Sequence, residues 1–225
     1  MLTGIAQQGK PAVTVIDLAA PPIAPEQLAT LLSPEEQQRA ERFRFSHLRE
    51  RFRIGRGMLR TLLAAYCKVA PEALRFAYSE YSKPSLPEFP NCSFNVSHSG
   101  DLWACAIGTG APLGIDIEHI RPLPDRDALA RRFFAPAEHQ AINSYAEADR
   151  AAAFYRCWTR KEAYLKALGF GLSKGLASFE VDCSESATSC IRDPTSPTIW
   201  MAHDLALPLG YAGALVIAAH TPDAR

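Results

Sequence analysis

This chain of 225 residues has no excess of either charge, because 24 lysines and arginines balance 24 aspartates and glutamates. A balanced chain has no global attraction to nucleic acid or to an anionic membrane surface. It also lacks any apolar run close to the ~20 residues that a membrane-spanning helix requires. We therefore expect neither nucleic acid nor membrane among its partners.

The six cysteines are scattered, and no two of them form a C-x-x-C pair. Structural zinc sites need thiolates or imidazoles at short, repeated spacings, so a zinc site is not expected. Cys105 and Cys157 lie within apolar runs and are predicted to be small core residues. The N-terminus lacks the charged, apolar and small-residue segments of a secretory signal. These absences together predict a reduced, cytoplasmic protein.

Strand patterns and helix patterns occur in both halves of the chain without regular β-α-β alternation, which favours an α+β fold. Strands are predicted at residues 12–18, 74–78, 93–96, 102–107, 113–118, 179–181, 198–201 and 212–219. Helices are predicted at residues 33–66 with a break near 45–48, at residues 127–145 with a restart near Pro136, and at residues 149–168 before Gly169. The polar segment 184–197 is predicted to be a loop or hairpin tip. The small-residue segment 108–112 is a candidate boundary between the two halves.

Two local patterns mark the first helical region. Ser33 and Pro34, with Glu36 three residues after the serine, predict a capped helix start. Five arginines then decorate the continuation of the helix, namely Arg49, Arg51, Arg53, Arg56 and Arg60. They are interpreted either as a solvated helix face or as a stripe that faces phosphate groups.

The segment Trp158–Lys166 lies in the last predicted helix. Glu162 and Lys166 are four residues apart and therefore neighbours on one helix face. An exposed ion pair is the commonest outcome of this spacing. An acid that can hold a metal beside a base that can hold a phosphate also indicates phosphoryl chemistry.

A pair of carboxylates follows the candidate boundary. Asp116 and Glu118 are two residues apart in a predicted strand and therefore project from the same face, while Ile115 and Ile117 enter the core. The pair is interpreted either as a solvated strand face or as a Mg²⁺ site, because a divalent cation removes the repulsion between the two acids.

Residues 95–100 form the third candidate. Ser97 and His98 end a predicted strand before Gly100, and both side chains can contact phosphate. Adjacent serine and histidine do not make a hydrolase triad, whose members meet through the fold. A hydrogen-bonded structural histidine is the alternative for His98.

The chain resembles the Sfp-type 4′-phosphopantetheinyl transferases. The resemblance rests on residues 94–100, 114–118 and 158–166, in this order and at this spacing. Residues 33–39 are similar to the first helix of the family, and Ser82-Lys83-Pro84 looks like its Gly-Lys-Pro turn with serine in place of glycine. The resemblance extends from about Ser33 to Phe179.

This resemblance implies a fold of two similar α/β halves packed as an intrachain pseudo-dimer, acting as a monomer. Residues 1–110 would form the N-terminal half that contributes to coenzyme A binding. Residues 111–225 would form the C-terminal half with the metal site and the catalytic helix. The enzyme would move the 4′-phosphopantetheine arm of coenzyme A to a serine of an apo acyl, peptidyl or aryl carrier protein and release adenosine 3′,5′-bisphosphate. The family leaves the carrier and its pathway open.

The resemblance also implies residue roles. The metal ligands for Mg²⁺, or Mn²⁺ in its place, would be Asp116, Glu118 and Glu162. The catalytic residues would be Glu162, Lys166 and His98. Coenzyme A would be held by Arg39, Arg56, Lys83, Pro84, Ser97, His98, Lys161 and Lys166. Either Glu162 or a metal-bound water would take the proton of the carrier serine. The carrier would dock on Arg131, Arg132, Phe133 and Phe134, unless the two phenylalanines belong to the core.

Two other functions compete with transfer. The same carboxylates can activate water, which would make the protein a Mg²⁺-dependent phosphohydrolase of coenzyme A or a nucleotide. A module that binds coenzyme A or a carrier without catalysis is the third possibility. Three acids kept together without a metal would cost such a module stability.

Overall fold

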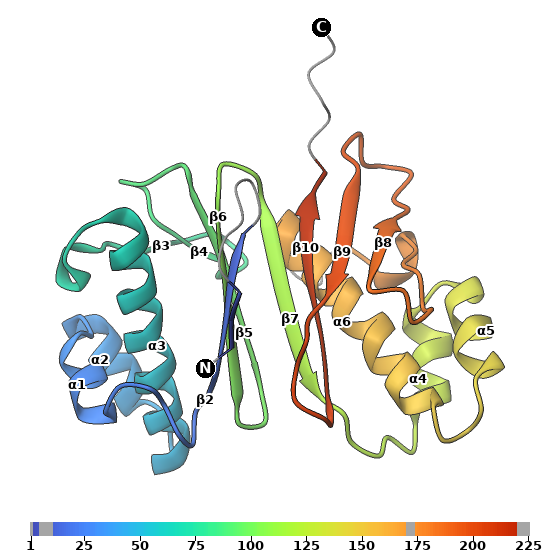
Figure 1. Cartoon of the computed structure of the whole chain (residues 1–225), viewed down its shortest axis with the longest axis horizontal. Coiled ribbons are helices and arrows are strands. Elements are labelled where there is room, and N and C mark those ends of the chain that lie inside the picture. Colours follow the sequence, from blue (N-terminus) through green and yellow to red (C-terminus); the bar gives the residue numbers. More distant parts are fainter. Residues whose placement is uncertain (1, 5–10, 170–173, 220–225) are drawn as a thin grey trace, which may run out of the picture.

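The computed structural model describes residues 2–4, 11–169 and 174–219. Its elements form layers, in which two antiparallel sheets pack against each other and helices cover both outer faces (Figure 1). An apolar cluster between the sheets joins the two halves of the chain. Its buried members are Val15, Leu102, Ala104, Ala106, Leu113, Ile115, Ile117 and Leu215. The protein is therefore an α+β fold of two similar halves, as the sequence predicts.

The N-terminal half contains a sheet with the strand order β1-β2-β6-β5. Its strands are β1 (Leu2–Gly4), β2 (Ala12–Asp17), β5 (Cys92–Ser99) and β6 (Leu102–Thr109), and β3 (Ala77–Tyr78) and β4 (Pro84–Ser85) form a separate ladder. The helices are α1 (Pro25–Thr30), α2 (Pro34–Glu41) and α3 (Ser46–Cys67), followed by the 3-10 turn Pro71–Ala73. Met58 and Leu63 of α3 pack in one buried cluster with Phe94 and Trp103 of the sheet. This cluster fixes α3 on the outer face of the sheet.

The C-terminal half contains a sheet with the strand order β7-β10-β9-β8. Its strands are β7 (Leu113–His119), β8 (Thr188–Ile191), β9 (Trp200–Asp204) and β10 (Tyr211–Ala218). The helices are α4 (Arg126–Phe133), α5 (Pro136–Ser144) and α6 (Arg150–Leu168), and the 3-10 turn Leu176–Ser178 comes next among the described elements. Tyr164 of α6 packs edge-on against Phe179 and Trp200, with ring centroids 4.7 and 5.5 Å away. These rings fix α6 on the outer face of its sheet.

The two halves repeat the same order of elements. Among the described elements, β2 and β7 are each followed by three helices and a 3-10 turn, and the last strand of each half pairs antiparallel with β2 or β7. In the N-terminal half, β1 precedes this repeated order. This closing pair is β2 with β6 in the first half and β7 with β10 in the second. β8 is an additional edge strand of the C-terminal sheet. The repeated order accounts for the pseudo-dimeric shape in Figure 1.

A buried ion pair anchors the long helix of each half. Glu36 accepts from Arg60 Nε at 2.7 Å, and Glu138 lies 2.8 Å from Lys161 Nζ. Each glutamate is the third residue of a helix that begins with proline. Each base also donates to the first carbonyl of the 3-10 turn after its helix, at 2.6 Å for Arg60 and 2.8 Å for Lys161. The same contacts therefore connect three segments in both halves.

Local sequence signals are confirmed at several element ends. Ser33 Oγ accepts from the Glu36 backbone N–H at 3.3 Å, and Glu36 Oε2 accepts from the Ser33 N–H at 2.9 Å, which forms the predicted capping box. The helix break lies at residues 42–45, between α2 and α3, so it comes earlier than the expected 45–48, and residues 46–48 already belong to α3. Gly169 ends α6 in the left-handed region with φ +77°, a conformation that glycine adopts without strain. Side-chain capping and backbone preference therefore act locally, as expected.

Other expectations differ from the structure. The sequence did not predict α1 or β8, and β8 lies in the segment expected to be a loop or hairpin tip. The strand expected at residues 74–78 is limited to Ala77–Tyr78, because the 3-10 turn precedes it. The strand expected at residues 179–181 is wrong, and an isolated bridge between Glu180 and Arg192 stands in its place.

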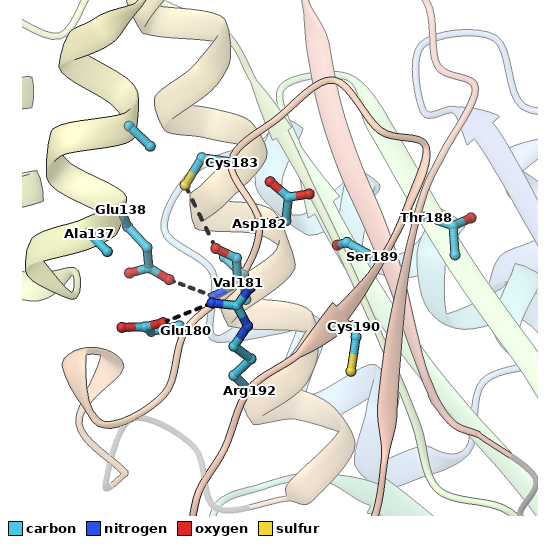
Figure 2. A pocket seen from close by; sticks show the side chains of 11 residues that line it. Ala137, Glu138, Glu180, Val181, Asp182, Cys183, Thr188, Ser189, Cys190 and Arg192 are labelled. Carbon is cyan, nitrogen blue, oxygen red and sulfur yellow. Dashed lines mark hydrogen bonds and ion pairs between the residues drawn. The ribbon is translucent and has the colours of Figure 1, made fainter.

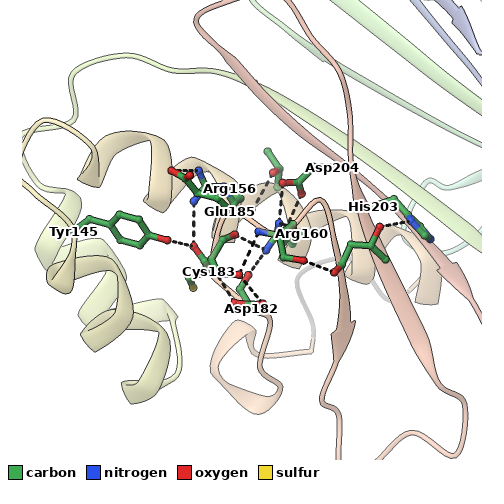
Figure 3. Close-up of polar contacts among 12 residues, drawn as sticks. Tyr145, Arg156, Arg160, Asp182, Cys183, Glu185, His203 and Asp204 are labelled. Atoms are coloured by element: carbon green, nitrogen blue, oxygen red, sulfur yellow. Dashed lines mark hydrogen bonds and ion pairs between the residues drawn. The ribbon is translucent and has the colours of Figure 1, made fainter.

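Side chains from the helices hold the segment after this bridge away from β8. Glu138 Oε1 accepts from the Val181 N–H at 2.7 Å, and the Arg160 guanidinium donates to carbonyls of Asp182 and Ser186 (Figure 3). Backbone groups used in this way cannot join a ladder. A cavity of about 360 Å³ lies between α5, this segment and β8 (Figure 2).

None of the helices in the described part of the chain is both long enough and apolar enough to span a membrane.

Candidate functional site

Helix α6 crosses strand β7 at backbone distance, and this crossing builds the site. A Cβ atom at Gly114 would lie 2.0 Å from the Ala163 carbonyl oxygen and 2.4 Å from the Ala167 nitrogen. Any side chain there would push the helix from the strand. Glycine therefore brings the acidic face of β7 beside Glu162 and Lys166 of α6.

The crossing brings Asp116, Glu118 and Lys166 into electrostatic range of Glu162. Burial and the negative charges of Asp116 and Glu118 together raise the pKa of Glu162 to about 7, while the Lys166 charge opposes the shift. Lys166 Nζ donates to Asp116 Oδ1 at 2.7 Å. Glu162 and Lys166 thus do not form the isolated surface pair that is the common outcome of their spacing. Glu162 and Lys166 of α6 therefore belong to the same charged cluster as Asp116 and Glu118 of β7.

The donor set suits a divalent cation. Asp116 is 5% exposed, and its Oδ2 atom is buried without a hydrogen-bond partner among the described residues. An orphaned carboxylate oxygen beside two further acids is the environment that a hard cation such as Mg²⁺ satisfies. Within the same residues, no group of three histidine, cysteine or acidic side chains converges closely enough to enclose an ion. The three carboxylates supply the oxygen donors that such a cation prefers. As the described residues are placed, these oxygens do not converge on one point, and Lys166 Nζ is bonded to Asp116 Oδ1.

Ser97 and His98 point to opposite faces of β5, as strand alternation requires. Ser97 Oγ donates to Asp116 Oδ1 at 2.9 Å and accepts from the Ile117 N–H and from Lys166 Nζ at 3.2 and 3.1 Å. A hydroxyl has one proton and two lone pairs, so these contacts use its full capacity. In this structure Ser97 has no proton left for a phosphate oxygen, which argues against the predicted phosphate contact.

His98 lines a cavity of about 290 Å³ between α3 and the sheet. The ring is accessible to solvent, and partial burial together with the Lys166 charge lowers its pKa. The predicted arginines Arg39 and Arg56 line the same cavity. The structure thus brings His98 to the two arginines that were expected to contact coenzyme A.

The two arginines differ in how they are held. Arg39 is exposed and lies over the Phe52 ring at 5.4 Å. Arg56 is tied to Glu36 by a 3.5 Å ion pair and donates to the Tyr78 hydroxyl at 3.2 Å, and its Nη1 atom is buried without a partner among the described residues. Arg39 can reach a ligand freely, whereas Arg56 offers one unused donor.

The sequence indicates Arg51 only as part of the arginine stripe, although its side chain lines this cavity too. It pairs with Asp101 and donates to the Gly100 carbonyl at the turn after His98. Arg51 precedes Gly55 by four residues, and Leu59 follows at the same interval, so the three lie on the helix face that lines the cavity. That spacing is the signal that could have found it.

Lys83 connects the predicted turn to the end of α6. Its Nζ atom donates to the carbonyls of Lys166, Ala167 and Leu113, the last at 3.4 Å. Burial lowers the pKa of Lys83 to about 8. Ser82 adopts φ +60°, the left-handed conformation that explains why glycine suits this position in the resembling family. Lys83 therefore caps helix carbonyls, and Pro84 begins β4 next to it.

The expectation that Lys161 binds coenzyme A is corrected. Its side chain is fully buried, and its Nζ atom contacts Glu138 and the carbonyls of Leu176 and Phe179 at 2.7–2.8 Å. An ammonium has three protons, and all three are used. Lys161 is a structural anchor of α6.

The predicted carrier-docking group is divided between surface and core. Phe134 is 3% exposed and stacks on Phe154 at 5.2 Å, so it belongs to the core. Arg131 and Arg132 are exposed, and Arg132 lies over the half-buried Phe133 ring. A docking surface at α4 would therefore use the two arginines and Phe133.

Family models match both halves of the chain. The model described as the 4′-phosphopantetheinyl transferase superfamily matches residues 112–218, and the model of the N-terminal part of 4′-phosphopantetheinyl transferase matches residues 23–109. The chain is 42% identical over 162 residues to the 4′-phosphopantetheinyl transferase HetI of Nostoc sp., covering 71% of this chain and 68% of HetI. It is 32% identical over 198 residues to the 4′-phosphopantetheinyl transferase Sfp of Bacillus subtilis, covering 88% and 86%.

The same similarity extends to psf-1 of Bacillus pumilus, a 4′-phosphopantetheinyl transferase that is 37% identical over 75% of this chain and 71% of its own. A crystal structure of the Thermotoga maritima holo-[acyl-carrier-protein] synthase aligns with 50% of this chain and 66% of that chain, with a TM-score of 0.39 and 21% identity. The chain belongs to the 4′-phosphopantetheinyl transferase superfamily, an enzyme class that uses coenzyme A as substrate. The family resemblance of its motifs is confirmed.

Proposed function

We propose that the protein transfers the 4′-phosphopantetheine arm of coenzyme A to a serine of an apo acyl or peptidyl carrier protein, in a Mg²⁺-dependent reaction that releases adenosine 3′,5′-bisphosphate. The observation that carries the proposal is the gathering of Asp116, Glu118 and Lys166 near Glu162, with the orphaned Asp116 oxygen among them. A bound Mg²⁺ would supply charge neutralisation at the pyrophosphate. Mn²⁺ is the alternative ion.

The reaction exchanges one phosphorus–oxygen bond for another. The carrier serine oxygen attacks the phosphorus that bears the pantetheine arm, and the bond from that phosphorus to the bridging oxygen breaks. The departing oxygen stays with adenosine 3′,5′-bisphosphate. In our proposal Lys166 stabilises the charge that develops on the transferred group, and Glu162 accepts the serine proton.

The phosphate-binding role is proposed for the cavity of the N-terminal half. Arg39, Arg51, Arg56 and His98 line it and supply cationic and hydrogen-bonding groups. Charged donors to phosphate are strong and bidentate when they come from arginine. In this division, residues 1–110 contribute to coenzyme A binding, and residues 111–225 carry the metal ligands and the catalytic helix.

We also propose a carrier-docking surface at α4 formed by Arg131, Arg132 and Phe133. Their exposed positive charge is complementary to an acidic carrier. The protein is proposed to act in the cytoplasm, which agrees with its six free cysteines, and as a monomer.

A mass measurement tests the transfer. Incubation with coenzyme A, Mg²⁺ and apo carriers of several pathways should add the mass of one phosphopantetheine arm to a carrier and release adenosine 3′,5′-bisphosphate in equal amount. Release of the bisphosphate without any carrier would identify a hydrolase instead. Coenzyme A binding without turnover on any carrier would identify a binding module.

Variants test the carboxylates. Asp116→Asn and Glu162→Gln should abolish transfer and leave the fold intact, because each change removes a charge from the cluster. Glu185→Gln is the matched control, since that carboxylate is 78% exposed on another surface. Transfer at the wild-type rate in either variant of the cluster would refute its assignment.

A further inference from the structure

The two sheets meet at β5 and β7 through side chains in place of a backbone ladder. Three alternate N–H groups of β7 donate to side-chain oxygens of β5 at 3.0–3.2 Å. The pairs, N–H donor first, are Ile115 with Asn95, Ile117 with Ser97, and His119 with Ser99. The interval of two on both strands keeps one register over the whole contact.

Two of these contacts contain a repeated unit. Ser97 Oγ donates to Asp116 Oδ1 at 2.9 Å while it accepts from the N–H of the next residue of β7. Ser99 Oγ donates to Glu118 Oε2 at 2.6 Å while it accepts from the N–H of the residue after Glu118. Each serine hydroxyl therefore binds one carboxylate oxygen of β7 and the backbone N–H of the residue that follows that carboxylate.

We propose that Ser97 and Ser99 are positioning residues that orient Asp116 and Glu118 for the cation. This inference rests on the proposed function of the carboxylates as metal ligands. A hydroxyl that donates to one carboxylate oxygen restricts rotation of the group and directs the other oxygen elsewhere. For Asp116 that other oxygen is the buried Oδ2 atom without a partner among the described residues.

Outer hydrogen bonds of this type tune metal sites strongly, and their loss costs about 10–100-fold in metal affinity. Ser97 also accepts from Lys166, so its removal would disturb two groups. Ser99 contacts Glu118 and the backbone of β7, is half-buried, and gives the cleaner test. We expect Ser99→Ala to weaken the cation site while coenzyme A affinity stays within about threefold of the wild-type value.

The experiment titrates MnCl₂ into the full-length protein saturated with coenzyme A and without carrier, with bound Mn²⁺ read by electron paramagnetic resonance. Ser99→Ala should raise the Mn²⁺ dissociation constant about 10–100-fold. Ser99→Thr keeps the hydroxyl and should stay within about threefold of wild type. Ser93→Ala is the matched control, because this serine lies on the same face of β5 and donates to the Gly110 carbonyl at 3.4 Å, away from the carboxylates.

Thermal unfolding without metal separates positioning from a merely structural role. Unchanged Mn²⁺ affinity in Ser99→Ala with lowered thermal stability would overturn the inference, since the serine would then only join the sheets. If Ser99→Ala fails to fold, the same titration is done with Ser99→Cys. A Mn²⁺ dissociation constant of Ser99→Cys equal to that of the wild-type protein would also overturn the inference. Absence of Mn²⁺ binding by the wild-type protein would instead overturn the proposed metal ligands themselves.

Discussion

The two halves of this protein share a scaffold but differ in the residues that the scaffold presents. In both, a glutamate at the third position of a proline-started helix pairs with a buried base on the long helix, as Glu36–Arg60 and Glu138–Lys161. The N-terminal half adds arginines and His98 around a cavity, and the C-terminal half adds carboxylates where β7 meets α6. The repeated residues thus maintain the fold, and the unrepeated ones are those proposed to carry out the chemistry.

The largest expected effect comes from breaking the shared anchor. Lys161→Met leaves the buried Glu138 without its cation, and Arg60→Met leaves the buried Glu36 with only its 3.5 Å ion pair to Arg56. Breaking a buried ion pair typically destabilises a protein by about 3–5 kcal/mol. Urea unfolding should show losses of this size in both halves. Arg131→Ala removes an exposed ion pair and should change the free energy of unfolding by less than about 1 kcal/mol. A large loss in the free energy of unfolding for one variant and none for the other would show that the two ion pairs are not equivalent.

The next effect should separate binding from chemistry. Arg39→Ala and Arg51→Ala each remove a charged donor worth about 1.5–3 kcal/mol, so the KM for coenzyme A should rise about 10–100-fold with kcat within a few-fold. Glu162→Gln should instead lower kcat. Steady-state kinetics with an apo carrier measures both quantities. Arg53→Ala is the control, because Arg53 pairs with Glu41 and does not line the cavity. A kcat loss in the arginine variants with unchanged KM would contradict the division of roles.

A smaller effect concerns pH and the C-terminal half alone. The pKa of Glu162 is raised to about 7 by burial and by Asp116 and Glu118, against the opposing charge of Lys166. A carboxyl that holds its proton more tightly in the folded state contributes stability at low pH that is lost as pH rises through about 7. In the presence of a chelator, the Tm of the wild-type protein should therefore fall between pH 5 and pH 8 relative to that of Glu162→Gln. Equal pH dependence of the two proteins would show that Glu162 titrates normally.

The smallest effect compares the ends of the two long helices. α3 ends at Lys68 with φ +58°, and α6 ends at Gly169 with φ +77°. A side chain in the left-handed region costs roughly 1 kcal/mol relative to glycine. Lys68→Gly should stabilise the protein by up to about 1 kcal/mol, and Gly169→Ala should destabilise it by a similar amount. Chemical unfolding measures both changes, and a loss of stability in Lys68→Gly would show that the lysine side chain contributes more than the backbone strain costs.

Signals that act over a few residues could be predicted from the sequence. The capping box at Ser33 needs only its neighbours, and the shared face of Asp116 and Glu118 follows from the two-residue period of a strand. Their relation to Glu162 was available only by family resemblance, because β7 and α6 are more than thirty residues apart in the sequence. The family assignment itself is confirmed by the comparisons.

The remaining expectations depended on partners that the sequence pattern does not specify. Lys161 and Lys166 are both lysines on α6, yet one is fully buried against Glu138 and the other reaches Asp116. Residues 179–181 have a strand pattern, but Arg160 takes the Asp182 carbonyl that the next hydrogen-bonded pair after Glu180 and Arg192 would use. In both examples, contacts with side chains that are distant in the sequence determined the structure, and the local sequence pattern did not.

The sequence by itself determined the helix and strand periods, the helix ends and the motifs of this enzyme family, because these depend on residues close together in the chain. Tertiary structure decided which charged groups became anchors and which remained available for chemistry. The contact of Gly114 with the backbone of α6 shows the reason. Long-range packing sets how closely two elements approach, and that approach determines which polar groups are desolvated and which partners they reach.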